Sequence, residues 1–217
     1  MNIVICQFAK APVLGRVKTR LTPEYSPEQA LAIHSALVED TVKRLSPLQH
    51  AEPEGGRVSY QLWYSDADKS FDRLAREYGV SLRQQVGSDL GQRLAHCAEQ
   101  NAKSGAAVIL IGSDCPYLTC EQLREAMDAW RAPEVDATVI PAADGGYVML
   151  GIKRFSRNIF QDITWGSAKV LEQTLRKCAE EKMQVSVLPA LQDIDYPADF
   201  KSLCETRTEF STLLAKS

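Results

Sequence analysis

A cation-rich segment near the start of the chain has the composition of a phosphate-binding loop. Residues 8–21 carry four basic side chains, and no acidic residue precedes Glu24 in a chain of net charge -3. Lysine and arginine neutralise phosphate oxygens, and a glycine lets backbone N–H groups approach them. A solvated basic loop would have the same composition. The candidate phosphate ligands are Lys10, Gly15, Lys18 and Arg20, and Lys18 is also a candidate catalytic residue.

One aspartate follows the most apolar run of the sequence. The run 107–111 leads into Gly-Ser-Asp-Cys-Pro, which places Asp114 at the end of a predicted buried strand, in a turn enforced by Pro116. A carboxylate in this position can ligate a Mg²⁺ ion carried by a phosphate. Aspartate also caps turns and helices, so a purely structural role is the alternative. We interpret Asp114 as a candidate metal ligand.

Three more acidic residues lie close together after the last predicted strand, in the segment 193–199. Alternation along an extended chain points Asp193 and Asp195 to the same side. Either one could complete a Mg²⁺ (or Mn²⁺) shell begun by Asp114, and the sequence does not choose between them. Asp199 falls in the first turn of the following helix, where a carboxylate favours the helix dipole, so its predicted role is structural.

The Gly-rich segment 141–147 is a candidate for contacts to a second substrate. Asp144 could orient or deprotonate an acceptor hydroxyl, and two glycines would let the backbone approach a sugar. A plain hairpin turn would give the same pattern. Asp144 is therefore a candidate catalytic residue, and the candidate substrate contacts beside it are Gly145, Gly146 and Tyr147.

Two further segments each carry one candidate. In Trp-Gly-Ser at 165–167, Trp165 could stack on a ring of a substrate, although a tryptophan is more often part of the core. In the segment 87–93, Asp89 and Gln92 suit the start of a helix, which would leave Arg93 to reach a phosphate.

The elements that must position these residues alternate along the chain. Apolar and β-branched runs predict strands at 3–6, 58–64, 107–111, 137–140, 147–152 and 185–188. Helical patterns begin at the capping boxes Ser26–Gln29 and Thr119–Gln122, and others fall at about 69–78, 90–103, 167–182 and 198–215. The stretch 47–57 is typical of a surface loop. This alternation predicts an α/β fold, with a Rossmann-like, mostly parallel, doubly wound sheet flanked by helices in a single domain, 1–217.

Composition and charge exclude several classes of protein. With 45% hydrophobic and 24% charged residues the chain is neither disordered nor fibrous, and its pI of about 5.7 leaves no basic field for nucleic acid. The longest aliphatic run, 106–111, is far shorter than the about 20 residues of a membrane span, and the start lacks a signal-peptide pattern. The six cysteines form no C-x-x-C pair. We therefore expect a cytoplasmic location.

Taken together, the motifs resemble a known family. F-x-K-x-P-x-x-G-x-V-K-T-R-L, G-S-D-C-P, D-G-G-Y, W-G-S and D-I-D-x-P-x-D-F occur in this order over almost the whole chain. They are similar to motifs of the bacterial family of proposed glycosyltransferases named after arsenosugar biosynthesis, within the nucleotide-diphospho-sugar transferase superfamily. The resemblance implies a GT-A-like fold, a nucleotide and pyrophosphate loop at Lys10–Arg20, and metal contacts at Asp114 and in the D-I-D segment.

The chain departs from the superfamily pattern in two places, which leaves the reaction open. The opening loop lacks the G-x-G/S-x-R pattern of most nucleotidyltransferases, and the D-x-D of many glycosyltransferases is reduced to a single carboxylate. One expected reaction is glycosyl transfer from a nucleoside diphosphate sugar to a small acceptor. The alternatives are nucleotidyl transfer from a nucleoside triphosphate to an acceptor phosphate, with release of pyrophosphate, and a non-catalytic nucleotide-sugar binding module.

Overall fold

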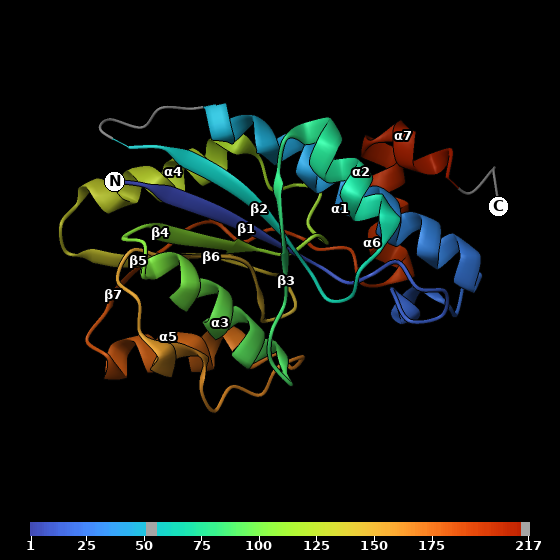
Figure 1. Ribbon diagram of the computed structural model, residues 1–217. Helices are drawn as coiled ribbons and strands as arrows, with labels where there is room; N and C mark the ends of the chain where they lie inside the picture. Colours follow the sequence, from blue (N-terminus) through green and yellow to red (C-terminus); the bar gives the residue numbers. More distant parts are fainter. Residues whose placement is uncertain (51–55, 214–217) are drawn as a thin grey trace.

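The computed structural model describes residues 1–50 and 56–213, and the strands of this part form one seven-stranded sheet (Figure 1). The order across the sheet is β3-β2-β1-β4-β6-β5-β7. Neighbouring strands are parallel except at β6, which runs antiparallel to β4 and β5, so the prediction of a mostly parallel sheet is confirmed. The strands are β1 (Ile3–Ala9), β2 (Val58–Tyr64), β3 (Ser81–Gln84), β4 (Ala107–Ile111), β5 (Val135–Pro141), β6 (Tyr147–Ile152) and β7 (Gln184–Val187).

Helices cover both faces of the sheet (Figure 1). One face carries α1 (Pro27–Leu45), α2 (Lys69–Tyr78) and α4 (Cys120–Asp128), and the other carries α3 (Leu90–Ala102) and α5 (Val170–Glu180). Beyond them, α6 (Pro197–Thr206) and α7 (Thr208–Ser211) pack against α1. The short 3-10 segments are η1 (Thr19–Leu21), η2 (Ser46–His50), η3 (Ala129–Arg131) and η4 (Arg157–Phe160). None of the described helices combines the length and the apolar composition that crossing a membrane would require.

The predicted helix starts are confirmed by their hydrogen bonds. At the start of α1, the Ser26 hydroxyl accepts from the backbone N–H of Gln29, and the Gln29 side chain accepts from the backbone N–H of Ser26. Thr119 and Gln122 form the same reciprocal pair at α4. These bonds satisfy N–H groups that have no partner inside the helix, which fixes where each helix begins.

The structure departs from the prediction in three segments. β3 was not predicted because Ser-Leu-Arg-Gln contains one apolar residue and forms an exposed edge of the sheet. The helix expected over 198–215 is interrupted, because α6 ends at Thr206 and the backbone of Arg207 is not helical. The last two residues of the expected helix, 214 and 215, lie outside the described part of the chain. The loop expected over 47–57 begins with η2, and 51–55 also lie outside the described residues.

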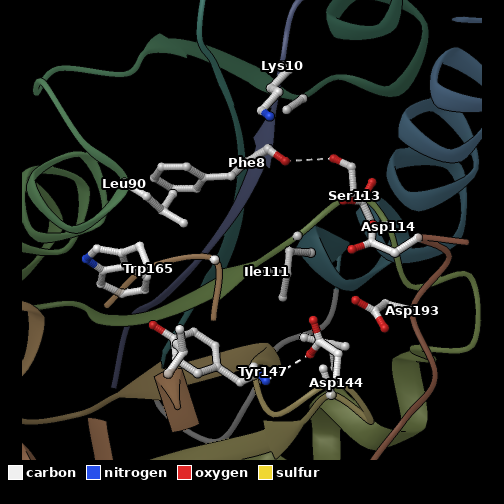
Figure 2. Close-up of a pocket in the computed structure, with 18 of the residues that line it drawn as sticks. Phe8, Lys10, Leu90, Ile111, Ser113, Asp114, Asp144, Tyr147, Trp165 and Asp193 are labelled. Carbon is white, nitrogen blue, oxygen red and sulfur yellow. Dashed lines mark hydrogen bonds between the residues drawn. The ribbon is translucent and has the colours of Figure 1, made fainter. Parts of the chain in front are cut away.

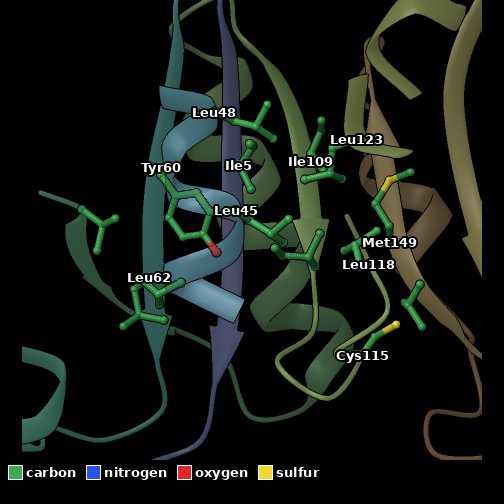
Figure 3. Close-up of a cluster of buried hydrophobic side chains, with 14 of the residues drawn as sticks. Ile5, Leu45, Leu48, Tyr60, Leu62, Ile109, Cys115, Leu118, Leu123 and Met149 are labelled. Atoms are coloured by element: carbon green, nitrogen blue, oxygen red, sulfur yellow. The ribbon is translucent and has the colours of Figure 1, made fainter. Parts of the chain in front are cut away.

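The core lies on both sides of the central strands. On the face drawn in Figure 3, Ile5, Tyr60 and Ile109 from three adjacent strands pack beneath Leu45 and Leu48. Because helices cover both faces, every residue of β4 is buried, and this is why its sequence is a continuous apolar run rather than an alternating one.

The register of the central strands brings two candidate loops together. β1 and β4 are parallel neighbours in which Gln7 is level with Ile111. The chain therefore leaves both strands at the same edge, and the cation-rich loop after β1 begins beside the Gly-Ser-Asp turn after β4.

Candidate functional site

A cleft of about 490 Å³ opens at this carboxyl edge of the sheet. Its walls come from the loop after β1, the turn after β4, the β5–β6 hairpin, the segment before α6 and the residues that begin α3 and α5. Figure 2 shows that the acidic side chains gather at one end and the aromatic ones at the other. Open α/β sheets bind their ligands beyond the carboxyl ends of the strands, so this cleft is the candidate site.

A buried hydrogen-bond network holds the Gly-Ser-Asp turn against β1. The Gln7 side chain donates to the Ser113 hydroxyl over 2.8 Å, and this hydroxyl donates to the Phe8 carbonyl, also over 2.8 Å (Figure 2). The Tyr60 hydroxyl donates to the Gln7 carbonyl oxygen over 2.6 Å. Gln7 is fully buried and Ser113 nearly so. Since every polar atom of this network is paired, it fixes the turn that carries Asp114.

Backbone hydrogen bonds bring the three acid-bearing segments together. The N–H of Ile194 donates to the Asp114 carbonyl over 2.9 Å, which joins the segment 193–195 to the turn after β4. The N–H of Ala143 donates to the Leu191 carbonyl over 3.1 Å, which joins the same segment to the β5–β6 hairpin. Residues distant in sequence therefore converge through main-chain contacts before any side chain is considered.

Lys18 lies between two of these acids. Its Nζ is 3.0 Å from Oδ1 of Asp114 and 3.1 Å from Oδ1 of Asp195, and it also donates to the Ile194 carbonyl. The Lys18 side chain is 5% exposed. Burial acts to lower the pKa of Lys18, but the charges of Asp114 and Asp195 outweigh it and raise the pKa above its ordinary value. Lys18 is therefore charged at every physiological pH.

The same contact sets the ionisation of Asp114. Desolvation acts to raise the pKa of this carboxyl, but the charge and hydrogen bond of Lys18 prevail and hold the pKa below its usual value. The Asp114 side chain is 45% exposed, so the carboxylate is both ionised and open to a ligand.

Arg20 extends the positive side of the site. Its Nη1 is 2.6 Å from Oδ2 of Asp195, and its guanidinium lies over the ring of Tyr196, 5.6 Å from the ring centroid. About half of the Arg20 side chain is exposed. An exposed guanidinium at the rim of a cleft keeps N–H donors free for an incoming anion.

Three carboxylates form a cluster beside Lys18. Oxygens of Asp144, Asp193 and Asp195 lie within 4.8 Å of one another. Burial, followed by the charges of Asp144 and Asp195, raises the pKa of Asp193 to about 6. Folding therefore disfavours the ionised form of Asp193, first through burial and then through its two acidic neighbours.

The cluster fits a hard divalent cation. Mg²⁺ takes oxygen ligands at about 2.0–2.1 Å, so two ligands on opposite sides of one ion are about 4.2 Å apart. The carboxylate oxygens of the cluster lie within 4.8 Å of one another, which is close to this separation. A bound cation would favour the ionised form of Asp193, which burial and the neighbouring carboxylates disfavour.

The other end of the cleft is apolar. Phe8, Leu90, Tyr147 and Trp165 line it, and the rings of Tyr147 and Trp165 meet edge to face at a centroid distance of 6.5 Å (Figure 2). Leu90 is 44% exposed although it is a large apolar side chain. An aromatic wall of this kind suits the face of a planar or ring-shaped group.

Most of the residues predicted for the site line the cleft. They are Lys10, Lys18, Arg20, Asp114, Asp144, Gly146, Tyr147, Trp165, Asp193 and Asp195. Asp199 accepts hydrogen bonds from the N–H groups of Asp195 and Tyr196 at the start of α6, which is a structural position.

Three predicted residues lie outside the lining. Gly15 has a φ of +72° in an exposed turn of the loop after β1. Gly145 has a φ of +90°, and a Cβ there would come 2.3 Å from the Ala168 carbonyl oxygen, so glycine is required for close packing. The Arg93 side chain donates to the Gly87 carbonyl over 3.0 Å.

The sequence reasoning missed His34 and the Gln7 network. His34 lies in the apolar stripe of α1, a pattern that indicates a core position, yet it lines the cleft. Its Nε2 is 3.0 Å from the Lys10 carbonyl, and a carbonyl only accepts, so Nε2 carries the proton. Burial lowers the pKa of His34. A glutamine inside an apolar strand is the signal that could have drawn attention to Gln7.

Comparison with solved structures places the fold among nucleotide-using transferases. The crystal structure of a "putative nucleotide-diphospho-sugar transferase" from Desulfovibrio desulfuricans G20 is 28% identical, with a TM-score of 0.84 over 100% of this chain and 95% of that one. The 4-diphosphocytidyl-2C-methyl-D-erythritol synthase of Anaerococcus prevotii DSM 20548 is 12% identical, with a TM-score of 0.58 over 91% and 94% of the two chains. The fold is the Rossmann-like GT-A type.

A third structure of this fold contains a metal and a nucleotide. The glucosyl-3-phosphoglycerate synthase of Mycobacterium tuberculosis, in complex with Mn²⁺, uridine diphosphate and glucosyl-3-phosphoglycerate, is 11% identical, with a TM-score of 0.56 over 99% of this chain and 80% of that one. At this identity the likeness concerns the fold alone.

Comparison of the sequence with curated proteins finds no match. Residues 50–167 match the model of one family, described as "Uncharacterized protein conserved in bacteria (DUF2064)". The matched segment contains the turn after β4, the β5–β6 hairpin and Trp165. Because it spans more than half of the chain, the protein belongs to the DUF2064 family.

Proposed function

We propose that the protein is a divalent-metal-dependent transferase that binds a nucleoside diphosphate sugar and moves its glycosyl group to a small acceptor. The observation that carries the proposal is one cleft with two unlike ends. Its charged end combines cations with the carboxylates of Asp114, Asp193 and Asp195, which suits a metal-bound diphosphate. Its aromatic end suits a ring.

Each residue of the charged end has a role in this proposal. A bound Mg²⁺ or Mn²⁺ would supply the charge that stabilises the departing diphosphate. Asp193 and Asp195, with Asp114, would hold the ion. Lys10, Lys18 and Arg20 would donate to phosphate oxygens. Lys18 pairs with two acids and must change partners to do so.

Asp144 is the proposed catalytic group for the acceptor. It is exposed and lies on the β5–β6 hairpin, and its Oδ1 accepts from the N–H of Gly146 over 2.9 Å. This bond fixes the carboxylate in the cleft, beside the acidic cluster. From there it would orient the acceptor hydroxyl and take its proton as the new glycosidic bond forms.

A second candidate function is nucleotidyl transfer, in which an acceptor phosphate attacks a nucleoside triphosphate. Two observations favour it. The turn after β4 offers a single carboxylate, and one structure of this fold, from Leptospira borgpetersenii, is described as a cytidylyltransferase. The same metal ligands and cations would serve that reaction.

The released product separates the two reactions. Purified protein would be incubated with Mg²⁺, candidate donors and candidate acceptors, and the phosphorus products followed by ³¹P NMR. Release of a nucleoside diphosphate supports glycosyl transfer, whereas release of pyrophosphate from a triphosphate replaces it with nucleotidyl transfer. Nucleotide binding without either product would favour the non-catalytic binding module.

Three narrower expectations stay predictions. They are the membership of the family named after arsenosugar biosynthesis, the cytoplasmic location, and the action of residues 1–217 as a single domain. The family membership rests on the sequence motifs alone. It would be contradicted if the protein showed no activity with any sugar-bearing donor.

A further inference from the structure

The hydrogen-bonding capacity of Lys18 is fully used inside the protein. A lysine ammonium has three N–H donors. In this cleft the ammonium donates to Oδ1 of Asp195 at 3.1 Å and to the Ile194 carbonyl, and its third close oxygen is Oδ1 of Asp114, an ion-pair partner at 3.0 Å. No donor of Lys18 is left for a phosphate while these contacts persist. In this respect Lys18 differs from Arg20, which is half exposed.

The ammonium of Lys18 also lies between Asp114 and Asp195, and Asp195 belongs to the acidic cluster that fits a divalent cation. Asp114 and Asp195 face it from two separate segments, and the side chain is 5% exposed, so no water layer separates the three groups. An ammonium and a divalent cation cannot both bridge the same pair of carboxylates, because their charges repel strongly at that separation. A divalent cation that takes both Asp114 and Asp195 as ligands would therefore displace Lys18 from between them.

We propose that Lys18 is a displaceable internal cation. Its charge holds Asp114 and Asp195 together. When a divalent cation takes over these two carboxylates, the freed ammonium turns to the phosphate groups of the nucleotide. This inference rests on the proposed function, because it needs a metal-bound phosphate ligand, but it does not depend on which group is transferred.

The exchange makes metal binding and phosphate binding mutually supportive. The metal alone must displace Lys18 and leave a buried ammonium with lost partners, which is unfavourable. A phosphate supplies new acceptors to the displaced ammonium. Each ligand therefore raises the affinity for the other beyond their direct contact, and by linkage the two effects are equal.

The test uses Lys18→Met, which keeps the length of the side chain and removes its charge, with Lys18→Gln as a second variant should the first not fold. The matched control is Lys177→Met, which removes a lysine that pairs with Asp162 and Glu180 outside the cleft lining. Circular dichroism establishes that each variant is folded. Two affinities are then measured, that for Mn²⁺ alone by electron paramagnetic resonance and that for inorganic pyrophosphate in saturating Mg²⁺ by calorimetry.

The exchange predicts opposite changes in the two affinities. Without the internal cation, Mn²⁺ alone should bind roughly tenfold more tightly, because nothing has to be displaced, while pyrophosphate should bind roughly tenfold more weakly, because its lysine donor is gone. Lys177→Met should change neither affinity.

Other results would overturn the proposal. Tighter Mn²⁺ binding with unchanged pyrophosphate affinity would make Lys18 a fixed counterion, and unchanged or weaker Mn²⁺ binding would mean that no displacement occurs. If the two affinities change in opposite directions but no donor is turned over, the exchange is supported and the proposed transfer reaction is not. The two claims are therefore tested separately.

Discussion

Replacing Asp193 by asparagine should stabilise the metal-free protein at neutral pH. Burial and the neighbouring carboxylates of Asp144 and Asp195 raise the pKa of Asp193 to about 6 in the folded state, against about 3.9 in an unfolded chain. A raised carboxyl pKa means that the ionised form is disfavoured by folding. Asparagine has a similar shape and carries no charge, so the variant escapes this cost.

The size and pH range of the effect follow from the two pKa values. At pH 4 Asp193 is protonated in the folded state and roughly half protonated in the unfolded chain, so it costs little stability. Between about pH 4 and 6 the unfolded state releases its proton first, so the free energy of unfolding falls as the pH rises. Above pH 6 the full cost applies, about 3 kcal/mol for a difference of about two pKa units at 1.36 kcal/mol each. Partial exposure of Asp193 reduces this to about 1–2 kcal/mol, or roughly 2–8 °C in the midpoint.

Thermal unfolding of the wild type and Asp193→Asn would be followed in EDTA at pH 4 and pH 7.5. The variant should melt higher at pH 7.5, with little difference at pH 4. Asp162→Asn is the matched control, since Asp162 is an exposed aspartate with positive φ, where asparagine is equally acceptable. Equal midpoints at pH 7.5, or a gain of the same size at pH 4, would refute the assignment of crowded charge to Asp193.

Three further changes test other parts of the structure. Ser113→Ala should lower the free energy of unfolding by about 1–3 kcal/mol, because it removes one of the two acceptors of the buried Gln7 amide and the donor to the Phe8 carbonyl, and a urea titration showing no loss would contradict the network. Asp40→Asn should lower the free energy of unfolding by about 2 kcal/mol in the same urea titration, because Asp40 pairs with both Arg44 and Arg207. An unchanged urea midpoint would contradict a stabilising role for these ion pairs. Trp165→Leu should raise the KM of the ring-bearing substrate roughly three- to tenfold without changing pyrophosphate affinity, and an unchanged KM would remove Trp165 from substrate binding.

The fold could be predicted from the sequence wherever the local sequence pattern is strong. The apolar run of β4 predicted a strand buried on both faces, and the capping box at Ser26 predicted the first residue of α1. β3 was missed because an exposed edge strand needs no apolar pattern. The reversed direction of β6 was not predicted either, because direction is set by pairing with β4 and β5 rather than by its own residues.

The sequence predicted which residues belong to the site better than it predicted which residues they contact. Residue type and position after a strand pointed to Lys18, Asp114 and Asp195, but the ion pairs among them join residues up to 177 positions apart. Such pairing follows from the sheet order and from the hydrogen bond between Ile194 and Asp114. Neither the sheet order nor this hydrogen bond can be predicted from the spacing of residues in the sequence. The position of Lys18 between Asp114 and Asp195 therefore required the three-dimensional structure.

The most direct test of the central claim is a thermal-shift panel of nucleoside triphosphates, diphosphates and diphosphate sugars, each with and without Mg²⁺. A ligand at 100 times its dissociation constant stabilises the folded state by about 2.7 kcal/mol, or roughly 5–11 °C for a chain of this size. The account predicts a shift of this order for a nucleoside diphosphate sugar, present with Mg²⁺ and lost without it. The absence of any Mg²⁺-dependent shift across the panel would contradict it.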